Sequence, residues 1–401
     1  MTAVAYVVLA FAVALTLYAY AGYAAALRLV AALRKRREAL PQQTPSEWPL
    51  VSITVPVYNE AATIAATLER LLTVDYPADR RQILVVSDAS NDGTDEIVRG
   101  FADRGVELLR VPVRGGKTAA ENAALPYLRG EIIVNTDASV LVAPDSLRPL
   151  IAAFADASVG VASGRDVSVA RLADSNTRGE SGYVGYEMWV RDLETRVEGI
   201  VGASGCYYAI RADLHRTPVR ADLSRDFSAP LIARAHGLRA VSVPDAVCFV
   251  PRTGSLQAEF RRKVRTMTRG MQTLRYNWRL LRPRESTPLF AWMLFSHKIC
   301  RWLVPWAGAL ALAAIGVLSW SLAPARWILA GALGLFALAF LGWRYSENRR
   351  LSRLFTVPAY LVSGNLAAVV ASIRALRGDR QPTWEPTRRD SVRAFPRPDA
   401  T

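Results

Sequence analysis

Acidic residues, glycines and a lysine stand in four short runs within the first third of the chain. VSITVPVYNE ends in Glu60, and ILVVSDASNDGT contains Asp88. RGGKTAAENAA joins two glycines to Lys117, and IIVNTDAS contains Asp137. A lysine and glycine amides can neutralise phosphate, and a carboxylate can hold a divalent cation between phosphates. In this order the four runs suit a nucleotide diphosphate.

Each run also has a simpler interpretation when it is taken alone. Asp88 could cap a helix together with Asp92, and Asp137 could cap the turn that follows it. Gly115-Gly116-Lys117 lacks the spacing of a P-loop. The interpretation therefore rests on the joint order of the runs.

Apolar segments precede or separate these runs and predict the elements that position them. Strands are expected at 50–57, 82–87, 106–111 and 131–135, and helices at 61–72, 94–103 and 118–128. Apolar strands that alternate with helices indicate a parallel sheet covered on both faces. Such sheets bind ligands at the carboxyl ends of their strands. Further strands are expected over 158–250, with a helix at 183–197.

The composition favours a folded membrane protein. The 401 residues include 50 Lys and Arg against 35 Asp and Glu, which gives a net charge of +15. Since 51% of the residues are hydrophobic, intrinsic disorder is excluded. The three cysteines form no zinc or disulfide pattern, which fits a reducing cytoplasmic face. The basic residues cluster beside apolar runs, so they indicate membrane flanks, and no nucleic-acid partner is expected.

The N-terminal segment is predicted to be a retained membrane anchor. Residues 3–27 contain no charged residue, and the apolar run continues to Leu33. This length can cross about 30 Å of hydrocarbon. The basic cluster at 34–37 follows the apolar run, whereas a signal peptide carries its basic residues before it. We therefore expect an anchor at 1–33, a linker at 34–49 and an internal domain at 50–251.

The second half of the chain is predicted to return to the membrane. Residues 252–284 contain ten basic residues and one acid, at the spacing of an amphipathic helix. This helix either lies on a lipid surface or presents a basic wall to phosphate, and both can hold on opposite faces. The expected divisions are basic interfacial helices at 252–302, two transmembrane helices at 303–343, a basic loop with a third membrane segment at 344–376, and a basic tail at 377–401.

The third membrane segment, 355–373, is the weakest of the apolar runs. It contains a proline, a glycine and an asparagine, and basic clusters lie on both sides of it. Both clusters favour the cytoplasm, so we expect a segment that dips into the membrane without crossing it.

The chain resembles the membrane-bound family 2 glycosyltransferases of GT-A fold, a group that includes cellulose, chitin and hyaluronan synthases. The resemblance covers about residues 50–285 and extends to the flanking membrane segments. It implies an α/β, Rossmann-like nucleotide-sugar-binding domain flanked by transmembrane helices. The residues that it implies beside the uracil and ribose of a UDP-sugar are Pro56, Tyr58, Glu60 and Asp88.

The remaining site residues follow from the same resemblance. Lys117 is placed near the nucleotide and Asp137 at the metal–diphosphate site. SGCYYAIR resembles the acceptor-facing turn, which begins with Ser204, Gly205 and Cys206. LSRDFSAPL resembles the segment of the catalytic carboxylate, which makes Asp226 the general base. The basic QxxRW element corresponds to the stretch that contains Arg262 and Arg265.

The chain departs from the family pattern at three motifs. Asp-x-Asp reads Asp137-Ala138-Ser139, so a hydroxyl stands beside Asp137 as the second expected ligand of Mg²⁺ or Mn²⁺. Thr-Glu-Asp reads Ser224-Arg225-Asp226, and QxxRW lacks its Gln and Trp, which weakens the case for polymer synthesis. Residues 384–388 faintly resemble the cytoplasmic WGTR-like tail of chitin and hyaluronan synthases.

These residues predict an inverting glycosyltransferase at the cytoplasmic face of the inner (plasma) membrane. A cation together with Lys117, Arg262 and Arg265 would stabilise the leaving diphosphate. One base and no carboxylate nucleophile imply a single displacement. The three or four spans favour a lipid or glycan acceptor, with a separate export partner for any polymer. The alternatives are a structural role for Asp226 at a helix N-terminus, and a catalytically weakened subunit that regulates or scaffolds a polysaccharide synthase.

The predicted topology can be tested by labelling cysteines in a background that lacks the three native ones. The basic cluster after the first span places residues 34–286 inside and the Met1 end outside. An impermeant external reagent should therefore label a cysteine at Thr2 and leave a cysteine at Gln42 unmodified in intact cells. External labelling at Gln42 would show that the orientation is reversed.

Overall fold

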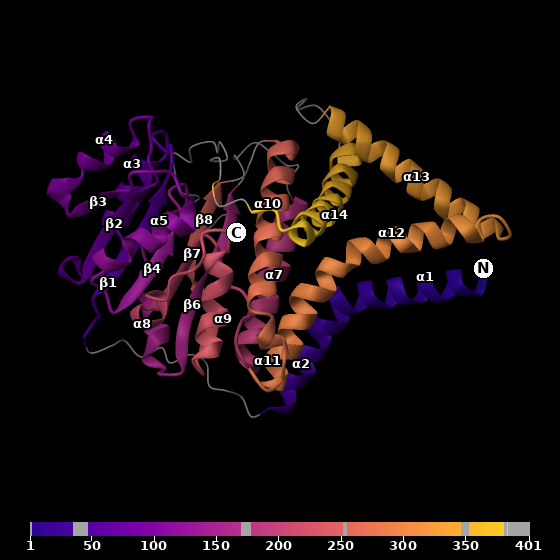
Figure 1. Ribbon diagram of the computed structural model, residues 1–401, viewed down its shortest axis with the longest axis horizontal. Coiled ribbons are helices and arrows are strands. Elements are labelled where there is room, and N and C mark those ends of the chain that lie inside the picture. Colours follow the sequence, from indigo (N-terminus) through magenta and orange to yellow (C-terminus); the bar gives the residue numbers. More distant parts are fainter. Residues whose placement is uncertain are drawn as a thin grey trace. The chain divides into compact units, whose positions relative to one another are not determined.

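The computed structural model describes residues 2–34, 47–169, 178–251, 255–345, 353–380 and 383 (Figure 1). The chain divides into two compact units. The helical unit contains Met1–Lys35 and Ser255–Asp379, and the sheet unit contains Arg36–Gly254 and Arg380–Thr401. Each unit is described by itself.

The sheet unit is built on eight strands in the order β3-β2-β1-β4-β7-β6-β8-β5. The first four strands of this order are parallel, β7 is antiparallel to both of its neighbours, and β6 runs parallel to β8. The bounds are β1 Val51–Val57, β2 Arg81–Ser87, β3 Val106–Arg110, β4 Ile132–Thr136, β5 Leu141–Val142, β6 Val159–Val169, β7 Tyr207–Arg211 and β8 Arg239–Pro251.

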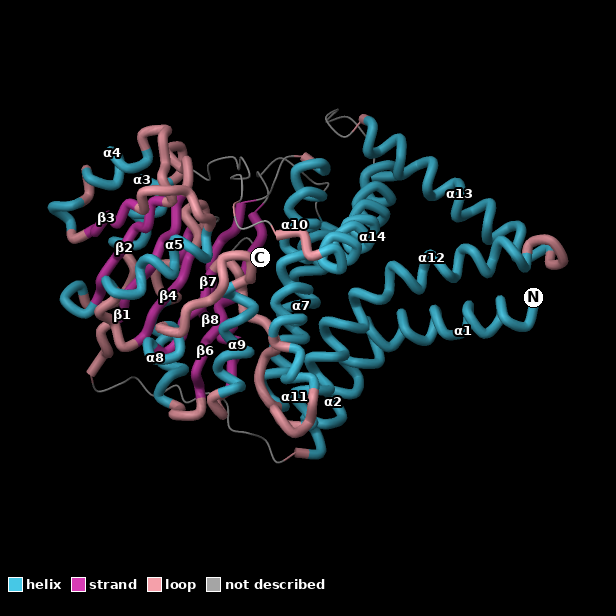
Figure 2. The backbone as a smooth tube through the Cα atoms, in the orientation of Figure 1, coloured by secondary structure: helices cyan, strands magenta, loops and turns pink. Residues whose placement is uncertain are grey.

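Helices cover both faces of this sheet, as Figure 2 shows. Their bounds are α3 Ile64–Leu72, α4 Thr94–Arg99, α5 Lys117–Ala124, α6 Leu147–Ala152, α7 Arg178–Val197, α8 Ala212–His215 and α9 Arg225–Ala235. Short 3₁₀ turns lie at Ala78–Arg80, Ala102–Arg104, Leu125–Tyr127 and Ala153–Ala155. The predicted alternation of strands and helices up to β4 is confirmed, with ends that differ by one to a few residues.

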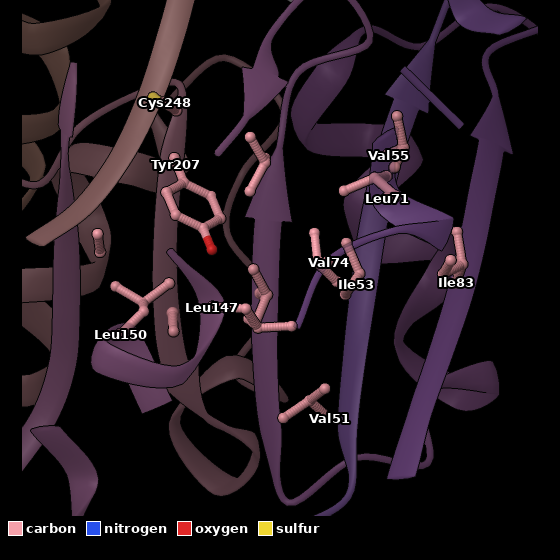
Figure 3. Packing of buried hydrophobic residues seen from close by; sticks show 14 of the residues in the cluster. Val51, Ile53, Val55, Leu71, Val74, Ile83, Leu147, Leu150, Tyr207 and Cys248 are labelled. Carbon is pink, nitrogen blue, oxygen red and sulfur yellow. The ribbon is translucent and has the colours of Figure 1, made fainter. Parts of the chain in front are cut away.

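The main core lies between one face of the sheet and helices α3 and α6. Val51, Ile53 and Val55 of β1 point into it, and Leu71 and Leu147 pack from the helices (Figure 3). Ser52 and Thr54, which alternate with these residues along β1, are polar yet fully buried. Both form hydrogen bonds with side chains of the neighbouring strands. Ser52 Oγ donates to Gln82 Oε1 at 2.5 Å, and Thr54 Oγ1 donates to Asn135 Oδ1 at 2.9 Å. Strand β1 is therefore buried on both faces.

The opposite face of the sheet carries α5 and α9. Ala120 and Ala124 of α5 pack on β2, and Ala229 and Ala233 of α9 pack on a cluster that includes residues of β4, β6 and β7. Strand β1 lies between β2 and β4, so the chain order reverses there. Such a switch point opens a crevice at the carboxyl ends of the strands. The loops after β1 and β4 begin at this edge.

The helical unit contains the apolar segments. Its bounds are α1 Thr2–Leu17, α2 Tyr23–Leu33, α10 Leu256–Tyr276, α11 Pro288–Leu294, α12 Arg301–Leu318, α13 Ala323–Arg344 and α14 Arg353–Arg377, with a 3₁₀ turn at Trp278–Leu281. A π-helical segment at Tyr18–Gly22 joins α1 to α2, and another at Phe295–Cys300 joins α11 to α12. By length and composition, four helical stretches of the described residues can cross a membrane: Thr2–Leu33, Pro288–Leu318, Ala323–Arg344 and Leu354–Arg377.

The last of these stretches includes the segment that the sequence marks as weakest. It forms one helix, α14, with Pro358 inside it and no break at Gly364. Its length satisfies a span, so the expectation that it only dips into the membrane stays a prediction.

An ion pair at the turn before β6 leads to a pH-dependent stability. Desolvation opposes ionisation of Asp156, but hydrogen bonds from Ser158 and Arg239 hold its pKa at about 2. Because the unfolded pKa is higher, the pair stabilises the fold above about pH 4 and loses this effect as pH falls towards 2. Asp156→Asn should therefore cost about 1–2 kcal/mol at pH 6, after discounting for the partly exposed site. Thermal unfolding in detergent should show the difference from wild type shrinking towards pH 2.5, and a constant difference would contradict this origin.

Candidate active site

The loops after β1 and β2 are joined by hydrogen bonds. Asn59 and Ala89 both take left-handed backbone conformations, at φ 52° and 59°. The Asn59 amide donates to Ser90 Oγ at 3.1 Å, and Asn59 Oδ1 accepts from the Asn91 amide at 2.9 Å. Left-handed residues other than glycine are strained and cluster at functional sites. The strain here lies at the edge where the sequence predicts the nucleotide.

Glu60 and Asp92 form further hydrogen bonds between the same two loops. The Glu60 amide donates to Thr94 Oγ1 at 2.9 Å, and the Glu60 carboxylate accepts from Thr63 Oγ1 at 2.7 Å. Asp92 accepts from the amides of Ala61 and Thr94, both at 3.1 Å. Desolvation opposes ionisation of Asp92, yet these hydrogen bonds together with that of the Thr94 hydroxyl lower its pKa. Asp92, and not Asp88, thus satisfies the backbone at the start of α4.

Asp88 instead holds the glycine loop that precedes Lys117. Its two carboxylate oxygens accept from the Gly115 and Gly116 amides, each at 2.8 Å, and the side chain is fully buried. Gly116 has φ 92°, a conformation that disfavours residues with a Cβ. Asp88 therefore fixes the start of α5, and with it the direction of Lys117. Its predicted place beside the uracil or ribose stays a prediction.

Tyr58 follows β1 and lies against Arg114, which sequence reasoning did not single out. The Arg114 guanidinium carbon lies 3.7 Å from the Tyr58 ring centroid, a cation–π distance. Arg114 immediately precedes the glycine pair, so the RGGK sequence carried the signal. Pro56 is buried within β1 opposite Val86, where it precedes the exposed loop.

Lys117 joins the first three runs to the fourth and to the acceptor turn. Its Nζ donates to Asp137 Oδ1 at 2.6 Å and to the Gly205 carbonyl at 3.1 Å. Burial disfavours its charge, but the carboxylates of Asp137, Glu121 and Asp226 outweigh burial and raise the pKa of Lys117. The lysine is thus a fixed cation at the crevice. Asp137 therefore binds this lysine through Oδ1.

Asp226 also lies against Gly205. A Cβ on Gly205 would come within 3.0 Å of Asp226 Oδ2, so the carboxylate occupies the space that a side chain would need. Ser224 Oγ donates to Asp226 Oδ1. Asp226 is in the first turn of α9, and Ser224, the residue before this helix, makes no side-chain cap. Gly205 therefore lies beside both Lys117 and the predicted base.

Ser204 shapes the acceptor turn from within. Its Oγ accepts from the amides of Cys206 and Tyr207 at 3.0 and 3.2 Å and donates to Asp166 Oδ1 at 2.5 Å. Asp166 also accepts from Cys248 Sγ at 3.4 Å, and burial raises its pKa. Ser204 itself is only 1% exposed, so it supports the turn rather than lining its surface. Asp166 was missed because it lies on β6 without a surrounding motif.

The residues proposed for a divalent cation fit an open site. Among the described residues, no three His, Cys, Asp or Glu side chains gather as a ready-made metal cage. Lys117 takes one carboxylate oxygen of Asp137, and Ser139 stands two residues further on. Mg²⁺ is often held by one or two carboxylates together with substrate phosphates and water. The donor set therefore suits a cation that arrives with a diphosphate.

Arg262 and Arg265 belong to α10 of the helical unit. The guanidinium of Arg262 donates to both carboxylate oxygens of Glu259, at 2.8 and 2.7 Å. Lys263 Nζ lies 3.8 Å from the Tyr360 ring centroid of α14. The structure thus shows these bases within their own unit, and their contact with a diphosphate stays a prediction. The WGTR-like segment at 384–388 lies outside the described residues.

Part of the chain matches a known protein family. Residues 52–210 match the family model described as glycosyl transferase family 2. The match covers less than half of the 401 residues. The same span contains the loops after β1, β2 and β4 and the acceptor turn. Residues 211–254 and the helical unit lie beyond it.

Relatives and solved structures extend the likeness. The chain is 31% identical over 156 residues to the beta-monoglucosyldiacylglycerol synthase of Trichormus variabilis. This alignment covers 38% of this chain and 33% of that protein. It thus matches about a third of that relative's length. It is 24% identical over 314 residues to an N-acetylglucosaminyltransferase of Mesorhizobium japonicum, over 70% of this chain and 73% of that protein.

One structural likeness spans both units. The mannosyltransferase PcManGT from Pyrobaculum calidifontis, solved in complex with GDP-Man and Mn²⁺, aligns with a TM-score of 0.72 and 25% identity. The alignment covers 93% of this chain and 100% of that one. The predicted GT-A α/β fold with flanking membrane-type helices is confirmed.

Removing the Asp137 carboxylate tests the metal–diphosphate site. Asp137→Asn takes the charge from both Lys117 and the cation, so UDP binding in Mn²⁺ should weaken and most donor turnover should be lost. Ser139→Asp restores an Asp-x-Asp sequence, and it should be tolerated with equal or tighter Mn²⁺ binding. Calorimetry of UDP and of Mn²⁺ measures both. Full turnover of Asp137→Asn in excess chelator would exclude a metal site here.

Proposed function

We propose that this chain is an inverting glycosyltransferase that moves a sugar from a UDP-sugar to a lipid or glycan acceptor. The observation that carries the proposal is that Gly205 contacts both Asp226 and Lys117, the lysine that binds Asp137. A carboxylate and a fixed cation beside one residue provide a base for the acceptor hydroxyl and a positive charge for the leaving group. A binding module alone requires no such pairing.

On the donor side, the leaving diphosphate gains one negative charge on its terminal phosphate as the glycosidic bond breaks. Lys117 is held in the charged form by its carboxylate neighbours, so it can stabilise that charge without a change of protonation. A divalent cation on Asp137 and Ser139 would supply Lewis-acid stabilisation of the diphosphate when bound. Asp88 and the two glycines keep Lys117 in place during the reaction.

On the acceptor side, Asp226 takes the proton from the acceptor hydroxyl. The hydroxyl oxygen forms the new bond to the anomeric carbon while the bond to the diphosphate oxygen breaks, and UDP leaves with that electron pair. One such displacement inverts the anomeric centre. Ser224 donates to Asp226 Oδ1, which leaves Oδ2, the oxygen nearest Gly205, as the proton acceptor.

The relatives support a lipid acceptor and leave several donors to be compared. One relative is named beta-monoglucosyldiacylglycerol synthase, and the solved mannosyltransferase is in complex with GDP-Man and Mn²⁺. Four helical stretches of the described residues are long enough to span a bilayer, which supports a lipid acceptor. Screening UDP-glucose, UDP-N-acetylglucosamine and GDP-mannose with diacylglycerol or a lipid extract separates these cases.

We further propose that α14 lies at the membrane surface, which keeps the basic tail cytoplasmic. The ammonium of Lys263 lies against Tyr360, near the middle of α14, and 3.6 Å from a Cβ placed on Gly364. A lysine at the bilayer centre is strongly unfavourable. The middle of α14 therefore fits the interface better than the hydrocarbon core.

A second candidate is a weakened subunit that binds UDP-sugar and regulates or scaffolds a synthase. The hydroxyl of Ser139 and the guanidinium of Arg225 at positions where the family motifs carry acids favour it. Release of UDP by purified protein in detergent separates the two: steady turnover supports the enzyme, and binding without turnover supports the subunit.

Asp226→Asn tests the assigned base. Asn keeps the shape of the side chain and cannot accept the proton, so transfer should fall by roughly 10²–10⁴-fold. UDP affinity should change little, because Lys117 and Asp137 are untouched. Asp213 stands in the first turn of α8, exposed and remote from any predicted role. Asp213→Asn is therefore the matched control and should keep wild-type transfer.

A merely structural Asp226 gives the opposite result. Asn serves near a helix N-terminus about as well as Asp, so both variants would then retain transfer and stability. Product formation and UDP calorimetry on the same preparations distinguish the two interpretations.

A further inference from the structure

A buried carboxylate that the mechanism does not use lies behind Lys117. Glu121 is 1% exposed, and neither of its oxygens has a hydrogen-bond partner in the described part of the chain. Its nearest cation is Arg225, with Nε 3.6 Å from Glu121 Oε2. A carboxylate removed from water without hydrogen bonds is costly unless a charge nearby offsets it. This residue therefore needs an explanation beyond packing.

Arg225 is the residue directly before the proposed base. It is 4% exposed, its Nη1 donates to the His215 carbonyl at 3.2 Å, and its Nη2 donates to Asn122 Oδ1. In the family motif this position carries Glu, whereas here it carries a cation. The compensating acid comes from α5. The acid near the base thus lies on α5, and the position beside the base on α9 carries a cation instead.

Glu121 also stands one helical turn after Lys117, a spacing that brings side chains onto the same face of α5. It therefore lies between a cation on the donor side and a cation on the base side. Burial raises the pKa of Glu121, and Lys117 and Arg225 oppose that shift. The charged and titratable groups that face Glu121 are Lys117 on its own helix, Arg225 and Asp226 on α9, Asp137 after β4 and Tyr208 on β7.

We propose that Glu121 is a positioning residue for the transfer reaction: its carboxylate holds the Arg225 guanidinium against α5 and so keeps the adjacent Asp226 directed at Gly205. The inference rests on the proposed function, because it concerns the base of that reaction. Arg225 is the first residue of α9, so fixing its side chain fixes the first turn that carries Asp226.

The physical reason is competition for Arg225. With Glu121 present, the buried guanidinium has a carboxylate partner on α5. Without it, the nearest carboxylate in sequence is Asp226, and pairing between them would turn the base away from the acceptor turn.

Glu121→Gln in the full-length protein is the direct test. Transfer should fall by about 10- to 100-fold, as expected for a misdirected catalytic group. UDP affinity should stay within about threefold, because Lys117 keeps Asp137. The acid limb of the pH profile for kcat/KM should also move, because a buried Arg225 without its carboxylate partner changes the charge around the base. Glu121→Asp, which keeps the charge, should return the limb towards wild type.

The matched control is the buried pair of Arg234 and Glu198, on α9 and after α7. Arg234 Nη2 lies 2.6 Å from Glu198 Oε1, and the two side chains are 11% and 12% exposed. Glu198→Gln should lower thermal stability without moving the pH limb. If Glu121→Gln does not fold, Arg225→Lys takes its place, because lysine keeps the charge and loses the planar geometry of guanidinium. Reduced transfer at unchanged UDP affinity then supports the proposal, and unchanged transfer overturns it.

The outcomes separate this inference from the proposed function. An unshifted pH limb in Glu121→Gln, with a loss of transfer no greater than in Glu198→Gln, leaves Glu121 a structural residue and the enzyme intact. If wild type turns over no sugar nucleotide with any donor tested, the proposed function fails and the inference fails with it. Full activity of Asp226→Asn alongside an impaired Glu121→Gln removes the base assignment and overturns the positioning role.

Discussion

The ammonium of Lys117 connects the parts of the candidate site. It bonds the carboxylate that follows β4 and a carbonyl of the acceptor turn, and its own position is set by the glycine loop on Asp88. A lysine that is largely removed from water keeps its charge only where carboxylates offset the loss of hydration. Three elements that are distant in sequence must therefore meet around one cation. The strained loops after β1 and β2 and the missing side chain at Gly205 both adjoin that meeting point.

The departures from the family motifs can be related to the groups that lie near them in the fold. A serine in place of the second acid of Asp-x-Asp leaves Asp137 shared between Lys117 and any cation, so the diphosphate itself must supply further metal ligands. Arginine in the Thr-Glu-Asp motif is matched by Glu121 on α5. The arginine thus has a physical counterpart on a neighbouring element, which argues for an intact site rather than a decayed one.

Much of the fold could be predicted from the sequence, because the hydrophobic pattern of the strands coincides with their burial. Strands β1, β2 and β4 are apolar runs that end in turns, and their helices have clear apolar faces, so their order and approximate ends followed from the sequence. Residues that act through a tertiary contact were not readable. Arg114, Glu121 and Asp166 carry no local pattern, since each matters through a partner that is between 38 and 104 residues away in the chain: Tyr58, Arg225 and Ser204.

The sequence by itself determined the alternation of strands and helices, the long apolar segments and the identity of the charged residues at the strand ends, because these depend on local periodicity and residue type. The tertiary structure decided which charges meet. In it, Asp88 accepts hydrogen bonds from the glycine loop, Asp137 pairs with Lys117, and Glu121 lies beside Arg225. Asp226 lies against Gly205. Pairing of buried charges depends on distances of a few ångströms between separate elements, and only the packing of α5 and α9 on the sheet sets those distances.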